Sequence, residues 1–291
     1  MPFTGELLAL TTVMCWSISV QFFEAASRRV GSIPVNIIRI AIALALFCLL
    51  LMVRDGTIIP ADFPLRAWFY LSLSGIIGFF IGDVFLFMAL VNLGPRLAML
   101  IHSLAAPATA IIGWVLLDES YRITQWMGIF IALAGVGLVI LERSPTPPAG
   151  SLQVRTISIK GLALGAGAFL GQAVGYIFSK VGMQTDTGYL DAFSSTQIRA
   201  IAAFFCFAAF VTATNRWGSV KNVVRDRRAL LYTAAGSGVG PILGVSLSLL
   251  ILHYHAAGVA ATCLSLVPRF MLPVARFLQK EPVAFRAGSG T

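Results

Sequence analysis

The run Gly78-Phe79-Phe80-Ile81-Gly82 returns later in the chain as Gly240-Pro241-Ile242-Leu243-Gly244, with both glycines 162 residues further on. Four more residues keep this separation: Ser103, Leu104, Glu119 and Gly128 correspond to Ser265, Leu266, Glu281 and Gly290. An ordered set at one constant offset indicates that the chain contains a duplicated unit. Glycines four residues apart lie on one face of a helix and allow close helix contact in lipid. The run therefore predicts two equivalent, tightly packed membrane helices.

The composition excludes an ordinary soluble protein. Apolar residues make up 58% of the chain and charged residues 11%, and the mean hydropathy is +0.87, whereas soluble domains carry about 25% charged residues. The net charge of +9 comes from basic residues that lie mostly between apolar runs instead of in one patch. They are therefore interpreted as loop charges that orient a membrane protein, and nucleic acid is not an expected partner.

Apolar runs long enough to cross a bilayer divide the chain into two units. A linker rich in Pro, Ser and Thr at 143–158 separates a first unit, 1–142, from a second unit, 159–291. We expect an all-α, polytopic membrane protein with about nine spans. These lie at 5–27, 32–53, 67–93, 96–117 and 123–141 in the first unit and at 159–183, 190–214, 228–253 and 257–278 in the second.

The second unit lacks a counterpart of the fifth span. Gly128 begins that span in the first unit, but its partner Gly290 is the second-last residue. We therefore expect a truncated tenth helix, in preference to a natural nine-span protein. Because five spans per unit is an odd number, the units should have opposite orientations and form inverted repeats, the arrangement of many secondary transporters. The excess of Lys and Arg in alternate loops predicts an external N-terminus.

The residues that recur in both units carry a family resemblance over nearly the whole chain. They are Trp16 in the first span, Arg39 and Arg199 in the second spans, the paired glycines in the third spans, Ser103–Pro107 and Ser265–Pro268 in the fourth, and Asp118-Glu119 and Lys280-Glu281 before the fifth. This set resembles the drug/metabolite transporter (DMT) superfamily, in its ten-helix branch of two EamA-type repeats. The resemblance implies transport without ATP of amino acids, other metabolites or drugs through a cavity between the repeats. It also implies cytoplasmic termini, in conflict with the loop charges.

Asp83 is the leading candidate for a functional residue. It lies in the middle of the third span, with apolar residues for at least one turn on either side. A charge at this depth costs about 2.5–3.5 kcal/mol on insertion scales. It is therefore a candidate for proton coupling or for binding a substrate amine. The alternative is a structural ion pair with an arginine inside the bundle.

Three arginines are further intramembrane charges. Arg39 and Arg199 lie at equivalent places in the two units, which favours a structural ion pair or a clamp on backbone carbonyls over contact with an anionic substrate. Arg269 in the ninth span has no such counterpart and follows Pro268, where a helix loses a backbone hydrogen bond. It is therefore predicted to line the substrate cavity.

Polar and aromatic residues of other spans are further candidates for the cavity. His102 could relay protons to Asp83, or it could simply be hydrogen-bonded in the bundle. Trp16 and Gln21 lie in the first span, and Gln172 and Tyr176 lie in the equivalent sixth span. Trp16 and Gln172 should face each other across the pseudo-axis. These side chains could stack on a small organic substrate and hydrogen-bond it, or they could form a packed helix interface.

The sequence shows no signature of catalysis. No nucleotide-binding loop or hydrolase motif occurs, and the four cysteines are interpreted as core residues. We therefore expect no enzyme activity, cofactor or metal. The expected function is secondary transport of a small metabolite, amino acid or drug, with proton coupling or exchange, in a bacterial inner membrane. The expected partners are the substrate and the bilayer, with a homodimer as an option. An inactive truncated transporter and an intramembrane enzyme are the alternatives.

Overall fold

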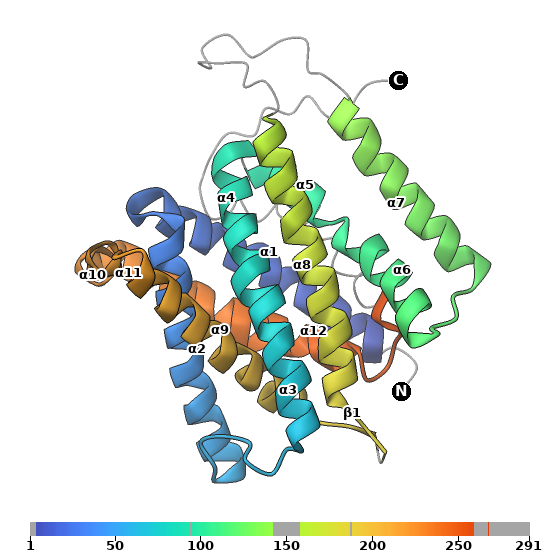
Figure 1. Cartoon of the computed structure of the whole chain (residues 1–291), viewed down its shortest axis with the longest axis horizontal. Helices are drawn as coiled ribbons and strands as arrows, with labels where there is room; N and C mark the ends of the chain where they lie inside the picture. The colour runs from blue at the N-terminus through green and yellow to red at the C-terminus, as the bar shows by residue number, and fades with distance from the viewer. Residues whose placement is uncertain (1–3, 94, 142–157, 187, 259–266, 268–291) are drawn as a thin grey trace.

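The chain folds into a bundle of helices with one short pair of strands (Figure 1). The computed structural model describes residues 4–93, 95–141, 158–186, 188–258 and 267. In chain order the elements are α1 (Thr4–Val30), α2 (Ser32–Asp55), α3 (Leu65–Ser74), the π-helix η1 (Gly75–Gly82), α4 (Asp83–Leu93), α5 (Pro95–His102), α6 (Ala105–Leu117), α7 (Ile123–Leu141), α8 (Ile159–Met183), β1 (Gln184–Thr185), β2 (Gly188–Tyr189), α9 (Ala192–Ala213), α10 (Trp217–Arg225), α11 (Arg227–Ser237), the π-helix η2 (Gly238–Val245) and α12 (Ser246–Ile251).

Seven helical segments among the described residues are long and apolar enough to cross a membrane. They are Leu7–Val30, Ser32–Asp55, Leu65–Leu93, Leu97–Leu117, Ile159–Met183, Ala192–Ala213 and Arg227–Ile251. The predicted polytopic helical membrane protein is therefore confirmed. The expected linker, most of the ninth span and the expected truncation near Gly290 lie outside the described residues. The inverted orientation of the two units stays a prediction.

Short turns with defined capping residues set the ends of several spans. Gly31, with φ of 92°, joins α1 to α2, and Gly56, with φ of 71°, ends α2. Glycine adopts these positive φ values readily because it has no Cβ. Asp191 accepts a hydrogen bond from the Ser194 backbone N–H at 2.8 Å and caps α9. Asp226 caps α11 by accepting from the backbone N–H groups of Arg228 and Ala229. Side chains therefore satisfy one N-terminal donor of α9 and two of α11.

The third span of each unit contains a π-helix. The sequence predicts uninterrupted helices over 67–93 and 228–253, and the structure is helical there, but η1 and η2 have the wider π turn. In η2, Pro241 has no N–H to donate to the preceding turn. In η1, glycines lie where other helices come closest. The apolar periodicity could not show either π-helix, because a local change of turn leaves the overall pattern apolar. Such segments often occur at functional sites.

The fourth span is interrupted, which corrects the prediction of one helix over 96–117. A turn at Ser103 and Leu104 separates α5 from α6. Pro107 cannot donate to the carbonyl of Ser103, and that carbonyl instead accepts from the Ala106 N–H at 3.2 Å. The run identified in the sequence as a repeated motif is therefore a helix break.

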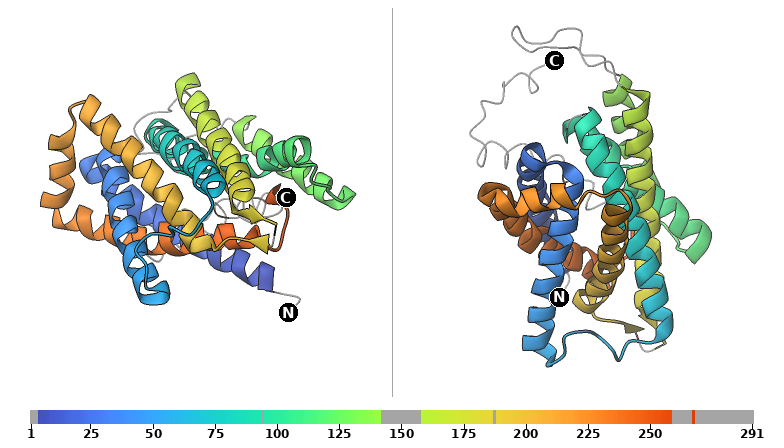
Figure 2. Two further views of the ribbon diagram at one scale, coloured as in Figure 1. Left: turned by 60° about the horizontal axis from the view of Figure 1, so that its bottom comes forward. Right: turned by 60° about the vertical axis from the view of Figure 1, so that its left-hand side comes forward.

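The first helix of each unit packs on the third span of the other unit. Helix α1 packs against α11, η2 and α12, and α8 packs against α3, η1 and α4, while α2 packs against α9 (Figures 1 and 2). A methyl group on Gly240 would lie 2.9 Å from Ser19 Cβ, and one on Gly78 would lie 3.5 Å from Gly175 Cα. Ser19 lies in α1 three residues after Trp16, and Gly175 lies in α8 three residues after Gln172, so the two positions are equivalent. Corresponding helices thus make corresponding contacts, with glycines at both crossings.

Helix α10 and the two short strands were not predicted, and helix α7 lies apart from the main contacts. Helix α10 lies in a segment that the sequence assigns to a loop, with Val220 and Val223 buried. Its alternation of buried valines with basic residues is typical of a helix at the membrane surface. Strands β1 and β2 pair Gln184 with Tyr189. Helix α7 lies at the edge of the bundle beside α5 and α6 (Figures 1 and 2).

Candidate functional site

Arg39 and Asp83 form an ion pair inside the bundle. Nη2 of Arg39 in α2 donates to Oδ2 of Asp83 at the start of α4. The two residues are 3% and 7% exposed. The rings of Phe23 and Phe87 lie 5.1 and 5.5 Å from Cζ of Arg39, measured to the ring centroids. Two aromatic faces and one carboxylate therefore surround this guanidinium. The Asp83 carboxylate is held by an arginine of its own unit.

Arg199 in α9 has a different environment. The residue is fully buried, and its Cζ lies 4.3 Å from the centroid of the Phe79 ring in η1. Its Nε, Nη1 and Nη2 atoms have no hydrogen-bond partner among the described residues. Tyr176 and Asp83 lie within electrostatic range of it. A cation–π contact uses the face of the guanidinium, so the N–H groups at its edge are left without acceptors.

Both arginines lie where a second span crosses the π-helix region of the other unit. Oγ of Ser237, just before η2, donates to the Arg39 carbonyl at 3.1 Å. At the equivalent crossing, a methyl group on Gly75 at the start of η1 would overlap the Arg199 carbonyl. The carbonyl groups of both arginines therefore lie against the start of the other unit's π-helix, whereas their side chains have different partners.

Tyr176 and Gln172 lie close to the Arg199 crossing. The Tyr176 hydroxyl is within reach of Ser248 and Gln172, and the Gln172 backbone lies 3.5 Å from where a methyl group on Gly82 would be. In the other unit, Trp16 lies equally close to Gly244 of η2. Trp16 and Gln172 thus occupy corresponding contacts with the two π-helices. Their predicted approach across the pseudo-axis stays a prediction.

The remaining predicted site residues are spread over the bundle. Gln21 is buried in α1. His102 ends α5, and its Nδ1 is buried without a hydrogen-bond partner among the described residues. The Asp83 carboxylate is bound to Arg39. The relay between His102 and Asp83 stays a prediction. Arg269 lies outside the described residues.

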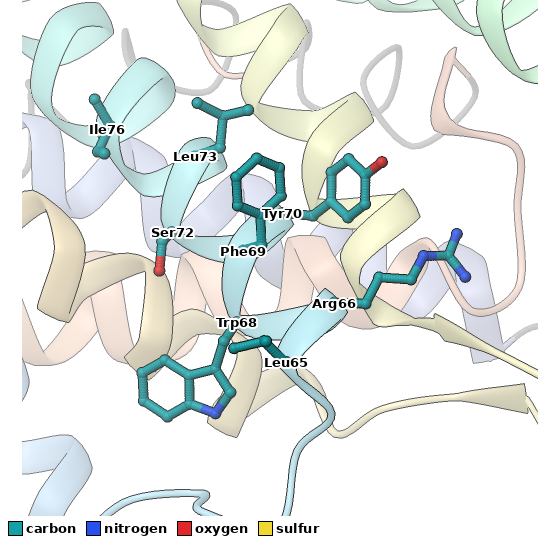
Figure 3. A pocket seen from close by; sticks show the side chains of 8 residues that line it. All are labelled: Leu65, Arg66, Trp68, Phe69, Tyr70, Ser72, Leu73 and Ile76. Carbon is teal, nitrogen blue, oxygen red and sulfur yellow. The ribbon is translucent and has the colours of Figure 1, made fainter.

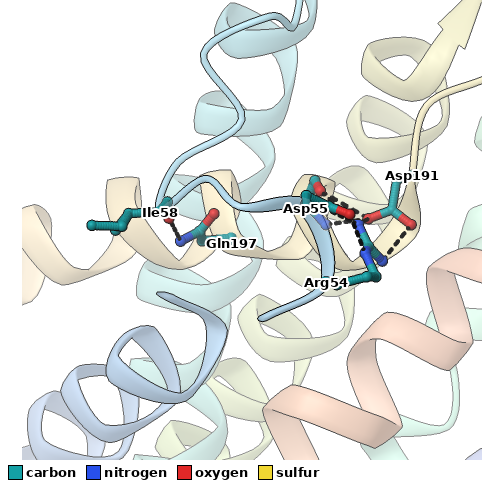
Figure 4. Close-up of polar contacts among 6 residues, drawn as sticks. Arg54, Asp55, Ile58, Asp191 and Gln197 are labelled. Atoms are coloured by element: carbon teal, nitrogen blue, oxygen red, sulfur yellow. Dashed lines mark hydrogen bonds and ion pairs between the residues drawn. The ribbon is translucent and has the colours of Figure 1, made fainter. Parts of the chain in front are cut away.

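A second cluster of charges, at the far end of α2, joins the two units (Figure 4). Arg54 Nη2 lies 2.7 Å from Asp55 Oδ2 and 2.9 Å from Asp191 Oδ2. Nearby, Gln197 Nε2 donates to the Ile58 carbonyl at 2.8 Å. Burial opposes ionisation of Asp191, but hydrogen bonds from Arg54 and Ser194 outweigh it and hold the pKa of this carboxyl below its ordinary value. Arg54 follows the predicted span 32–53 and therefore counts among the loop charges, and its pairing with Asp191 was not predicted.

Glu119 forms another junction between the units. Its carboxylate accepts hydrogen bonds from Lys180 of α8, from the Tyr121 hydroxyl and, at 3.0 Å, from the Ala257 backbone N–H. Burial alone would raise the pKa of Glu119, but these three donors hold it below the ordinary value. The sequence marked Glu119 only as a repeated residue. Nothing in its spacing identified Lys180 as the partner.

Comparison with known proteins relates part of this chain to a family. Residues 3–141 match the EamA-like transporter family. This match covers the first unit, just under half of the chain, and shows a similarity of that unit to the family. A solved structure titled "Crystal structure of protein" aligns with 97% of this chain and 90% of its own, with a TM-score of 0.66 and 16% sequence identity, a likeness that shows the fold alone. No curated protein matches the chain.

The EamA-like match divides the candidate site. Arg39, Asp83 and η1 lie within it, whereas Arg199 and Tyr176 lie beyond it. The match of the first unit to a transporter family favours transport over the alternative of an intramembrane enzyme. The resemblance to the DMT superfamily stated from the sequence is thereby confirmed.

One groove of this EamA-like protein lies on the outside of the bundle and is not a route for a polar solute. It has a volume of about 680 Å³, and Figure 3 shows its lining. Leu65 and Phe69 in this lining are strongly exposed, as expected for side chains that face lipid. Arg66 lies over the Tyr70 ring, 5.8 Å from Cζ to the centroid. Both residues come from the first turns of the span, where aromatic and basic side chains anchor a helix at the membrane surface.

Proposed function

We propose that this EamA-like protein is a secondary transporter that moves a small organic solute across a bacterial inner membrane by alternating access. The observation that carries this proposal is the Arg39–Asp83 ion pair, buried inside a bundle of membrane spans. Charged side chains in membrane spans are rare, and they mark ion and substrate pathways. The EamA-like match over residues 3–141 supports the same class of function.

The ion pair can couple a proton to movement of the spans. Protonation of Asp83 removes its negative charge, and the electrostatic attraction that holds α4 against α2 is then lost. Arg39 would keep its two aromatic contacts but lose its charged partner. Because the α2 backbone also receives the hydrogen bond from Ser237 next to η2, a change at Asp83 would reach the π-helix of the other unit. Trp16, Gln21, His102, Gln172 and Tyr176 would line the solute path.

The test is transport by the purified protein in liposomes. A panel of labelled amino acids and other small metabolites would first identify a solute that accumulates when a pH gradient is imposed. We expect Asp83→Asn to abolish this accumulation and to retain counterflow, which needs no net proton movement. Asp62→Asn is the matched control, because Asp62 is an exposed acid in the loop between α2 and α3. Gradient-driven accumulation that survives in Asp83→Asn would contradict the proposed coupling.

The same ion pair supports a second candidate, solute exchange without an ion. Asp83 is bound to a permanently charged arginine, and a pair that stays closed in all states would serve only to hold the helices together. Exchange predicts counterflow in the unsubstituted protein with no accumulation under any pH gradient. The same liposome assay therefore separates the two candidates.

A further inference from the structure

The buried charges of the bundle are not balanced. Among the described residues, the charged residues that are buried are Arg39, Asp83 and Arg199. The Glu119 side chain is also largely buried, but Lys180 neutralises it. Arg39 and Asp83 neutralise each other, so Arg199 is left as one positive charge in excess. A buried charge without a partner is strongly destabilising. A protein that keeps one has reason to pair it with something that binds.

The second unit lacks the residue that would supply a partner. The position that corresponds to Asp83 by the repeat offset is Val245, so the acid that pairs with Arg39 has no counterpart next to Arg199. The Phe79 ring lies 4.3 Å from Cζ of Arg199, but a phenyl ring supplies no oxygen or nitrogen acceptor for its N–H groups. The three nitrogens thus remain without acceptors among the described residues. A duplicated arginine has lost its duplicated carboxylate.

The residues beside Arg199 include a glycine and a hydroxyl group. Gly78 of η1 lies beside Nη2, since a methyl group on Gly78 would lie 3.4 Å from that atom. The hydroxyl-bearing Tyr176 is on the neighbouring helix α8, within electrostatic range. A planar fork of N–H donors suits the two oxygens of a carboxylate. One unpaired positive charge also matches the single negative charge of a carboxylate better than the nearly double charge of a phosphate monoester.

We propose that Arg199 binds the carboxylate of the transported solute, so that the solute class of this protein is small organic acids, including amino acids. This inference rests on the proposed transport function. Arg199 is closed off in the present arrangement and would become accessible when η1 moves against α9. That movement would be part of the alternating access already proposed.

Binding in detergent micelles tests this assignment. The probes are L-amino acids and 2-oxo acids, each compared with its carboxamide, and the readout is the dissociation constant from ligand-induced stabilisation. We expect at least one acid to bind the unsubstituted protein at least tenfold more tightly than its amide, since hydrogen bonds to charged groups contribute this much. In Arg199→Met the acid should lose this advantage, and in Arg199→Lys it should keep part of it. Arg66→Met, at an exposed arginine that also lies over an aromatic ring, is the matched control and should behave as the unsubstituted protein.

Three binding results and one transport result would overturn the assignment. Amides that bind as tightly as acids would do so, as would an acid preference that survives in Arg199→Met. The third is the absence of any acid that binds. The comparison of acid with amide on the unsubstituted protein stands even if a variant fails to fold. Failure of the transport proposal is distinguishable, because acids would then bind in micelles without crossing liposome membranes. Transport of uncharged or cationic solutes alone would sustain the transport proposal and overturn the role of Arg199.

Discussion

Arg39 and Arg199 occupy corresponding places in two units of one chain, and their side chains have different surroundings. Arg39 donates to Asp83 between two phenylalanine rings, whereas Arg199 contacts one ring and has no acceptor for its N–H groups among the described residues. Equivalent backbone positions therefore do not imply equivalent roles. Val245 stands at the position that corresponds to Asp83 by the offset of 162, and this difference makes Arg199 a candidate for ligand binding.

The largest expected effect concerns the paired arginine. Arg39→Leu leaves the Asp83 carboxylate buried without its partner, so we expect the free energy of unfolding to fall by about 3 kcal/mol. The double variant Arg39→Leu with Asp83→Leu should recover most of this loss, because no unpaired charge remains. Unfolding in mixed micelles by increasing denaturing detergent would measure all three. Losses that simply add in the double variant would mean that the two residues do not act as a pair.

The first glycine of each π-helix offers a test of how closely the backbone packs at the Arg199 crossing. Gly75→Ala should destabilise the protein by about 1–3 kcal/mol, because the added methyl group would overlap the Arg199 carbonyl. Gly238→Ala, at the first residue of η2, is the control, because no atom lies within 4 Å of an added methyl group there. This second change should be neutral or stabilising by up to about 1 kcal/mol, since alanine favours helix over glycine. Equal effects at the two positions would show that the crossing at Arg199 is looser than described.

A smaller loss of stability is expected at acidic pH. It tests, at a carboxylate outside the membrane spans, whether a charge with hydrogen-bonding partners stabilises the fold. The pKa of Glu119 is held below its ordinary value. The stabilisation from its ionised form is therefore complete above the unfolded pKa of about 4.3 and is lost as the pH falls through the lower folded pKa. We expect a loss of about 2 kcal/mol between pH 5 and strongly acidic conditions, measured as the melting temperature across that range. Glu119→Gln should lack this component of the pH dependence. A variant that follows the same pH curve as the unsubstituted protein would assign the acid sensitivity to other groups.

Much of the fold could be predicted from the sequence because hydrophobic length is a strong signal. The span predicted at 159–183 coincides with α8, and the one at 190–214 differs from α9 by one or two residues at each end. The constant offset of the repeat also located the glycines at both helix crossings. The π-helices, the break at Ser103 and the surface helix α10 were missed, because each depends on local hydrogen bonds that apolar periodicity does not record.

The site was less predictable, since it depends on which side chains meet in three dimensions. Asp83 could be found from its depth in an apolar run, and Arg39 and Arg199 from their repetition. Which arginine holds the carboxylate could not be derived, because both lie early in the second span of their unit and the sequence does not show which one Asp83 meets. The partners of Glu119 likewise come from parts of the chain that are far apart in sequence.

The most direct test of the difference between the two arginines is the melting temperature of Arg199→Met measured beside Arg39→Met in the same detergent. If Arg199 is kept for a ligand, its replacement by an apolar side chain of similar length removes an uncompensated buried charge, and the melting temperature should stay unchanged or rise. Arg39→Met should melt many degrees lower than the unsubstituted protein. A fall in Arg199→Met as large as that in Arg39→Met would mean that both arginines hold the bundle together, and it would contradict the division of roles.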